Sequence, residues 1–156
     1  RRRVKKSEAG MEEDLEKIKT PQISHDAKLS AEREAEAKEI FAGILGVRMT
    51  GMTLAFKPWD LLVQWHGVEN SIIDLIDRPG FTHKMLRRFT DATMNMLDQI
   101  EEQGLLAYDI PTIHCAGAYT DELPSANFDP EKPTAADTWT MGMAQIFSTV
   151  SPGHAR

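Results

Sequence analysis

Residues 57–106 read KPWDLLVQWHGVENSIIDLIDRPGFTHKMLRRFTDATMNMLDQIEEQGLL, and this stretch decides the fold that the sequence predicts. Apolar residues recur in it at helical spacing, so it is expected to be a helical connection. It lies between two strand-like segments, Val47–Phe56 and Ile110–Cys115. A strand, a helical crossover and a second strand in this order are typical of a βαβ unit with parallel strands.

Three helices are expected inside this crossover. Pro58 suits a helix start and Gly67 breaks the first helix. The second helix starts at Asn70 or Ser71 and ends before Pro79, and the third runs from about Phe81 to Gln103, where Gly104 closes it. The apolar face of the first helix consists of Trp59, Leu62, Val63 and His66, and that of the third of Phe81, Met85, Phe89, Ala92, Met96 and Ile100.

Two further segments complete the predicted architecture. A helix opening at Ser30 carries apolar residues at helical spacing and ends at Gly46. These apolar residues are Ala37, Ile40, Phe41, Ile44 and Leu45. A long loop, Ala116–Ala136, precedes a third strand candidate, Thr138–Phe147. Gly51 inside the first strand segment indicates a bulge or a close approach of another backbone.

Parallel strands with helical crossovers predict the α/β class and a partial (β/α)8 TIM barrel. A complete barrel needs about 250 residues, so the 156 residues are expected to be a segment of a longer protein. We divide the chain into an N-terminal helix and connector, residues 1–27, and a partial barrel domain, residues 28–156. Open sheet edges and uncovered helix faces predict marginal stability or self-association, with a homodimer as one form.

Composition limits the partners. The formal net charge is −6, whereas a nucleic-acid-binding protein needs a basic face, so we expect no nucleic-acid partner. The basic cluster Arg1–Lys6 could be an arm that binds nucleic acid or a membrane surface, but a solvated terminus or the tail of an upstream helix is the favoured interpretation. No apolar run approaches the roughly 20 residues of a membrane span. The single cysteine, Cys115, excludes an internal disulfide, and we expect a soluble cytoplasmic protein without a membrane partner.

The candidate ligand-binding residues follow predicted strands or lie at their ends, where α/β enzymes bind their substrates. They are Trp59, Asp60, Gln64, His114, Gln145 and Ser148. Trp59 could stack on a planar ligand and Asp60 could bind a cation, but core packing and the helix dipole explain the two equally well.

His114 and Cys115 are residue types that bind zinc, yet neighbours on a strand point to opposite faces. A structural role is therefore favoured for this pair, with His114 as a substrate contact the better functional interpretation. The sequence contains no phosphate loop, dinucleotide-binding glycine motif, nucleophile elbow or paired-cysteine zinc motif. Several enzyme classes are thereby excluded.

A series of motifs carries a family resemblance. It comprises Pro58-Trp59-Asp60-Leu61-Leu62, Gly67-Val68-Glu69-Asn70 and Asp74-Leu75-Ile76-Asp77-Arg78-Pro79-Gly80-Phe81, then Leu86, Thr90-Asp91-Ala92 and Gly104, then Ala144-Gln145-Ile146-Phe147-Ser148 and Ser151-Pro152. Over most of Leu15–Pro152 the chain resembles the uroporphyrinogen decarboxylase superfamily. The resemblance implies a (β/α)8 barrel that either decarboxylates a tetrapyrrole without a cofactor or moves methyl groups between corrinoid proteins and thiols.

The resemblance also sets the expected ligands. The substrate would be a tetrapyrrole or a corrinoid-linked small molecule, with no cofactor in this chain and zinc in the complete protein only if it is methyltransferase-like. The family's arginine-rich first-strand motif is absent, Gln64 stands where a tyrosine is expected, and Ser148 stands where an acidic residue is frequent. We expect the segment to be inactive by itself. The alternative is a non-enzymatic domain that binds a corrinoid or a protein partner.

Overall fold

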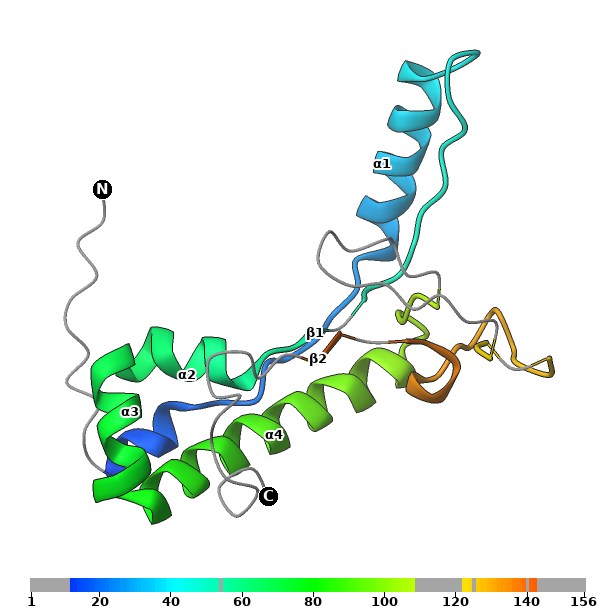
Figure 1. Cartoon of the computed structure of the whole chain (residues 1–156). Coiled ribbons are helices and arrows are strands. Elements are labelled where there is room, and N and C mark those ends of the chain that lie inside the picture. The colour runs from blue at the N-terminus through cyan, green and yellow to red at the C-terminus, as the bar shows by residue number, and fades with distance from the viewer. Residues whose placement is uncertain (1–11, 54, 109–121, 125, 140, 143–156) are drawn as a thin grey trace. The chain divides into compact units, whose positions relative to one another are not determined.

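The computed structural model describes residues 12–53, 55–108, 122–124, 126–139 and 141–142 (Figure 1). In chain order the elements are the 3₁₀-helix η1 (Glu12–Lys17), α1 (Ala27–Ile40), β1 (Ala55–Phe56), α2 (Pro58–His66), α3 (Val68–Asp77), α4 (Pro79–Glu102), the 3₁₀-helix η2 (Ala135–Asp137) and β2 (Met141–Gly142). The chain divides into two compact units. Unit 1 comprises Arg1–Pro21, Leu54–Leu97 and Thr140–Arg156, and unit 2 comprises Gln22–Thr53 and Asp98–Trp139. The division into residues 1–27 and 28–156 stays a prediction.

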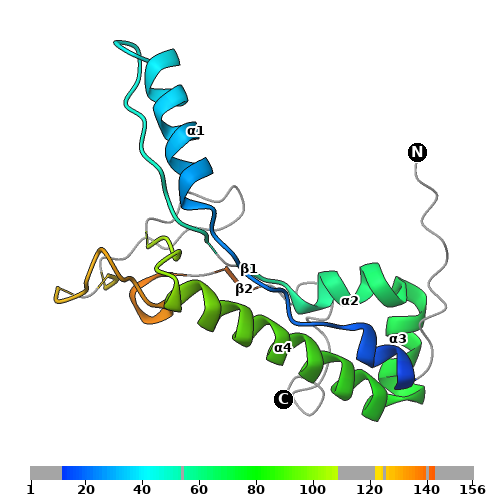
Figure 2. The same ribbon diagram turned by 180° about the vertical axis from the view of Figure 1, so that it is seen from behind.

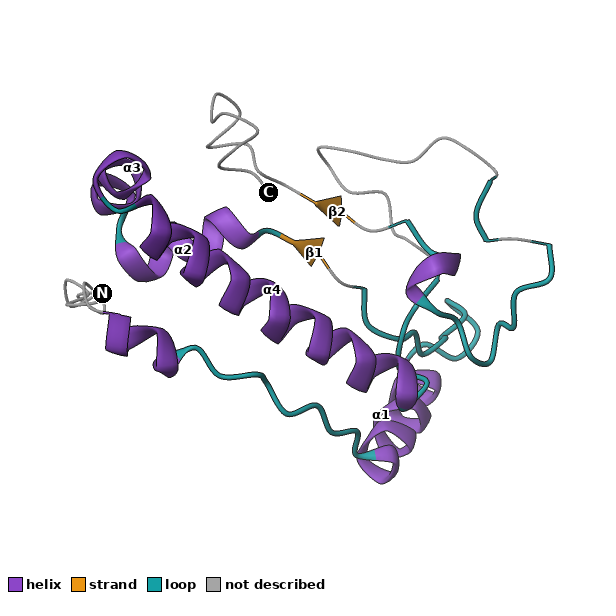
Figure 3. Ribbon diagram, turned by 90° about the horizontal axis from the view of Figure 1, so that it is seen from below, coloured by secondary structure: helices purple, strands orange, loops and turns teal. Residues whose placement is uncertain are grey.

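The predicted partial TIM barrel is wrong. Helices dominate the described residues, and the strands found there are only two residues long. β1 pairs with β2 in parallel, with Ala55 opposite Met141 and Phe56 opposite Gly142 (Figure 3). The parallel direction fits the order strand, helices, strand, but two pairs of residues do not make the sheet of a barrel.

The barrel was predicted from segments with the composition of strands, of which the described structure pairs only a few residues. Val47–Phe56 was expected to be one strand, yet only Ala55–Phe56 forms one, and Met52 makes an isolated bridge. A strand persists only where a neighbouring segment pairs with it, and the described pairing of this segment is limited to Ala55–Phe56 and the bridge at Met52. Ile110–Cys115 lies outside the described residues, as does most of Thr138–Phe147, so their pairing stays a prediction.

The three helices of the crossover are confirmed. Pro58 opens α2, and Gly67 ends it at a φ of 89°, where its amide donates to the Val63 carbonyl at 2.9 Å. α3 starts at Val68, a little earlier than the sequence predicts, and ends before Pro79 as expected. Pro79 opens α4, because a residue in the first turn needs no amide hydrogen for the helix ladder.

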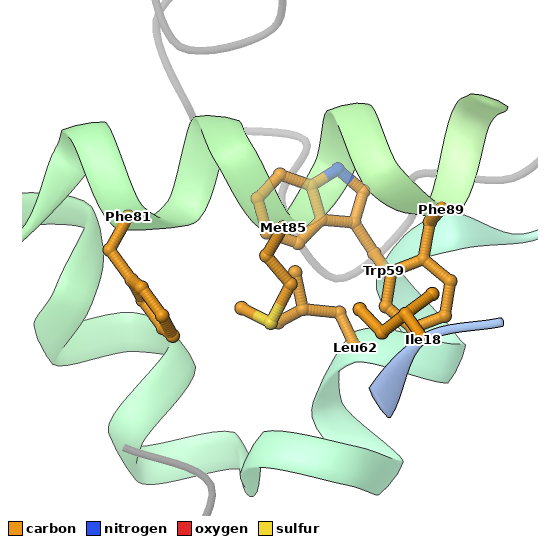
Figure 4. Close-up of a cluster of buried hydrophobic side chains, with 6 residues drawn as sticks. All are labelled: Ile18, Trp59, Leu62, Phe81, Met85 and Phe89. Carbon is orange, nitrogen blue, oxygen red and sulfur yellow. The ribbon is translucent and has the colours of Figure 1, made fainter. Parts of the chain in front are cut away.

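The core of unit 1 consists of Ile18, Trp59, Leu62, Phe81, Met85 and Phe89 (Figure 4). The three α4 residues lie one helical turn apart and present one face to α2, which supplies the tryptophan and the leucine. Figure 2 shows α2, α3 and α4 from behind. Trp65 of α2 is partly exposed, and its ring meets the Phe89 ring edge-on, with centroids 5.2 Å apart. The helical periodicity thus identified the core of this unit.

In unit 2, α1 differs from the prediction at both ends. Its N-cap is Asp26, whose carboxylate accepts from the Leu29 amide at 2.9 Å, and the helix ends at Ile40 rather than near Gly46. The apolar residues at helical spacing beyond Ala37 are exposed. They therefore do not form a core in the described structure.

Gly51 of unit 2 confirms the predicted close approach of two backbones. The Met52 amide donates to the Leu105 carbonyl at 2.6 Å, and the Ala107 amide donates to the Met52 carbonyl at 2.9 Å. A Cβ on Gly51 would meet the Leu105 oxygen and would lie 2.8 Å from the Ala107 nitrogen. The parallel bridge between Met52 and Leu106 therefore needs glycine at this position.

Candidate functional site

The predicted site residues are only partly described. Trp59 is buried in the core of unit 1, which favours its packing role over stacking on a ligand. Asp60 is half-buried in the first turn of α2, and Gln64 is exposed one turn later on the same side of the helix. His114, Gln145 and Ser148 lie outside the described residues. The proposed ligand contacts therefore stay predictions.

A buried polar cluster in unit 1 is the best-organised chemical feature that the structure describes. We define it as His66 at the end of α2, Asp74 in α3 and Arg78 just after α3. His66 Nε2 and Asp74 Oδ2 are 2.7 Å apart. Arg78 donates twice to the same carboxylate, from Nε to Oδ1 at 2.9 Å and from a terminal nitrogen to Oδ2 at 2.6 Å. One carboxylate thus joins the end of α2 to the junction of α3 and α4.

Local backbone features hold the cluster in place. Gly67, at a positive φ of 89°, makes the turn between α2 and α3, and His66 meets Asp74 eight residues further along. The Asn70 amide donates to the His66 carbonyl at 3.0 Å, and the Ser71 hydroxyl donates to the Gly67 carbonyl at 2.7 Å. The Gly67 carbonyl also accepts from the Ser71 amide at 3.0 Å, so these bonds tie the end of α2 to the first turn of α3.

The hydrogen bonds of the cluster favour the ionised form of the Asp74 carboxylate. Burial alone would raise the pKa of Asp74, which is 4% exposed, but hydrogen bonds from Arg78 and His66 outweigh it and lower that pKa. The hydrogen bond to Asp74 raises the pKa of Arg78 in turn. Because an ionised carboxylate only accepts, His66 Nε2 carries the donated hydrogen. Arg78 also lies over the Phe81 ring, 4.7 Å from its centroid.

The cluster is structural rather than catalytic. A histidine oriented by a buried aspartate is part of hydrolytic triads, where it activates a neighbouring hydroxyl. Here His66 and Asp74 are both buried, and the hydroxyl of the nearby Ser71 is buried and engaged with a backbone carbonyl. The i, i+4 spacing of Asp74 and Arg78 is a usable sequence signal for the ion pair, whereas the sequence pattern around His66 predicts only that it shares an apolar helix face.

A second feature is a small open cavity in unit 2, with a volume of about 220 Å³. Its lining combines a cation and an anion, Arg48 and Glu131, with the hydroxyl-bearing residues Thr50 and Tyr108. The Tyr108 ring is fixed edge-on against Phe128, with centroids 4.8 Å apart. The cavity lies below the roughly 300 Å³ at which ligand pockets usually begin, so it suits only a small polar molecule.

Metal-ligand sets and membrane-spanning helices are both lacking in the described part of the chain. No three or more His, Cys, Asp and Glu side chains gather there as a metal site, so these residues do not supply a zinc ligand set. None of the described helices combines the length and apolarity needed to cross a membrane.

Comparisons with known proteins identify no family. No protein-family model, curated protein or solved structure matches the chain significantly. The resemblance to uroporphyrinogen decarboxylases therefore rests on the motifs of the sequence alone.

Proposed function

We propose that the chain acts in a protein similar to the uroporphyrinogen decarboxylases, with a tetrapyrrole or a corrinoid-linked molecule as its substrate. One observation carries the proposal: the motif residues of the resemblance have separate structural tasks within one helical unit. Leu62 fills the core, Gly67 makes the turn between helices, and Asp74 binds Arg78. The proposal rests on these motifs, and the reaction follows from them only by analogy.

α2 begins two residues after β1 and carries two of the predicted polar contacts on one side, the half-buried Asp60 and the exposed Gln64. On this proposal Asp60 and Gln64 contact polar groups of the ligand, while Trp59 supports α2 from the core. His114, Gln145 and Ser148 are proposed as further contacts.

The proposal makes no assignment between decarboxylation and methyl transfer. Both ligands present a large macrocycle with carboxylate or amide substituents, which exposed amides such as Gln64 can bind through hydrogen bonds. No step is assigned to zinc, because the described residues offer no ligand set for it. We place the protein in the cytoplasm, where its single cysteine would stay reduced.

Ligand titration tests the proposal directly. The 156-residue chain is titrated anaerobically with uroporphyrinogen and separately with cobalamin, and the quenching of tryptophan fluorescence is recorded. We expect saturable binding of one of them, weakened about fivefold by Gln64→Ala, since a lost hydrogen bond costs about 1 kcal/mol. Gln22→Ala, at another exposed glutamine, is the control and leaves binding unchanged. Failure of both ligands to bind would refute the proposal.

The second candidate function is a non-enzymatic protein-binding domain. It is favoured by large apolar side chains that α2 and α3 expose, among them Leu61, Trp65 and Ile76. Such surfaces mark protein interaction sites when they form contiguous patches. The same titration separates the two candidates, because a protein-binding domain binds neither macrocycle.

A further inference from the structure

The open cavity of unit 2 is large enough for a small organic molecule. Its volume is about 220 Å³, and one water molecule takes up about 30 Å³ in the liquid. A ligand of roughly ten carbon, nitrogen and oxygen atoms therefore fits, whereas a tetrapyrrole or corrinoid macrocycle is far too large. The cavity is thus a candidate site apart from the one in the proposed function.

Two walls of the cavity are joined through their backbones. Residues 48–51 form one wall, and residues within 104–108 form the second. The parallel bridge between Met52 and Leu106 links the two, and Gly51 allows their close approach because it has no Cβ. These two walls are therefore in place before any ligand binds.

Hydrogen bonds also fix the third wall, which comes from residues 130–133. The Asp129 carboxylate accepts from the Glu131 amide at 2.9 Å. The Ala135 amide donates to the Glu101 side chain and so ties this loop to the end of α4. A preformed site loses little binding free energy in ordering its own walls, so it can hold even a small ligand.

The lining is apolar where it is buried and charged where it is exposed. Leu106 and Ala107 are only 4% and 7% exposed, and Pro133 is also buried. We call these three residues the cavity floor. Arg48 and Glu131 are exposed at the opening of the cavity. A ligand would gain most by placing an aliphatic group on the floor and charged groups at the opening.

The charges of the lining favour a ligand that carries both signs. A simple anion would be attracted by Arg48 but repelled by Glu131, and a simple cation would meet the reverse. Arg48 already takes part in another interaction, but a guanidinium has five N–H donors and can bind a carboxylate as well. The hydroxyl groups of Thr50 and Tyr108 add neutral hydrogen-bonding partners to the same lining.

We propose that this cavity binds a small aliphatic amino acid in its zwitterionic form. The carboxylate of the ligand binds Arg48, its ammonium group binds Glu131, and its aliphatic side chain lies on the cavity floor. Because the two charges are exposed, water screens them, and the dissociation constant is expected to be on the order of 1 mM.

Titration of the full chain with L-valine, followed by amide chemical shifts in ¹⁵N–¹H spectra, tests the proposal. Two analogues each lack one charged group: 3-methylbutanoate has no ammonium group, and 2-methylpropylamine has no carboxylate. The variants Arg48→Gln and Glu131→Gln remove one charge of the site each. Arg33→Gln and Glu36→Gln are the matched controls, since both residues are exposed in α1 of the same unit.

We expect saturable shifts at amides of the three walls with L-valine and at least about fivefold weaker binding of either analogue. Arg48→Gln and Glu131→Gln should each weaken valine binding about fivefold through the loss of a charge-assisted hydrogen bond, and the controls should leave it unchanged. No saturable shift up to about 50 mM valine, equal binding of an analogue, or equal losses in the controls would overturn the proposal. The macrocycle titration is read separately, so either proposal can fail without the other.

Discussion

Replacing Asp74 with asparagine tests the central interaction of unit 1. The new side chain would have the shape of the native one but no charge, and its amide nitrogen would face one of the donors that the carboxylate now accepts from. His66 and Arg78 would then lose their shared acceptor, and the histidine would be left buried without its charged partner. We expect the substitution to destabilise unit 1 without changing its core.

The expected loss of unfolding free energy depends on how deeply the two partners of Asp74 are buried. The hydrogen bond from His66 is fully buried and ends on a charge, which is worth about 1.5–3 kcal/mol. The Arg78 side chain is 42% exposed, so water screens its ion pair and about 1 kcal/mol or less is assigned to it. Asp74→Asn should therefore lower the free energy of unfolding by about 2–4 kcal/mol at pH 7.

Urea unfolding followed by tryptophan fluorescence measures this change, because the buried Trp59 reports on the core of unit 1. Protein concentration is kept constant, since self-association would add to the apparent stability. Asp77→Asn, at an exposed acid on the same helix, is the control and should change the free energy by less than about 0.5 kcal/mol. A loss below about 1 kcal/mol for Asp74→Asn, or equal losses for both variants, would refute the reasoning.

The pH dependence gives an independent test of the same interaction. The pKa of Asp74 is lowered on folding, so its contribution is fully present above the unfolded pKa and is lost as pH falls through the folded pKa. The difference in stability between wild type and Asp74→Asn should persist from pH 7 to about pH 4 and shrink below it. A difference that stays constant down to about pH 2 would contradict the lowered pKa.

Three further substitutions test the packing. Leu62→Ala should cost about 3 kcal/mol in urea unfolding, whereas Leu61→Ala at the exposed neighbour should cost less than about 1 kcal/mol; similar costs would contradict the core shown in Figure 4. Gly67→Ala should cost about 1–2 kcal/mol because its φ is positive, while Gly80→Ala, with open space around it, should be neutral or stabilising. Gly51→Ala should speed hydrogen exchange at the amides of the bridge between residues 52 and 106, and unchanged protection there would rule out the close backbone approach.

The helices of unit 1 and their core could be predicted from the sequence because the information is local. Apolar residues recur every three or four positions in 57–106, and such spacing places them on one side of a helix in any surroundings. Pro58, Gly67 and Gly104 likewise mark helix ends through their own backbone preferences. These predictions needed no knowledge of which segments come together.

The barrel and the predicted site required contacts between distant segments. Val47–Phe56 has the composition of a strand, but a strand exists only where another segment pairs with it, and the described pairing is limited to Ala55–Phe56 and the bridge at Met52. The role of Trp59 was equally undetermined, because a tryptophan at the start of a helix can face a core or a ligand. Its burial among residues of α2 and α4 decides for the core.

Local sequence patterns are enough to place three helices in residues 58–102, with turns at glycine and proline, and to show that the chain is acidic. Which side of α3 faces inward depends instead on contacts with the neighbouring helices. Its isoleucines are more apolar than Ser71 and Asp74, so amphipathicity alone would bury them. The partners His66 and Arg78 reverse that outcome, because a buried carboxylate with satisfied hydrogen bonds holds the helix in one orientation and leaves the apolar side outward.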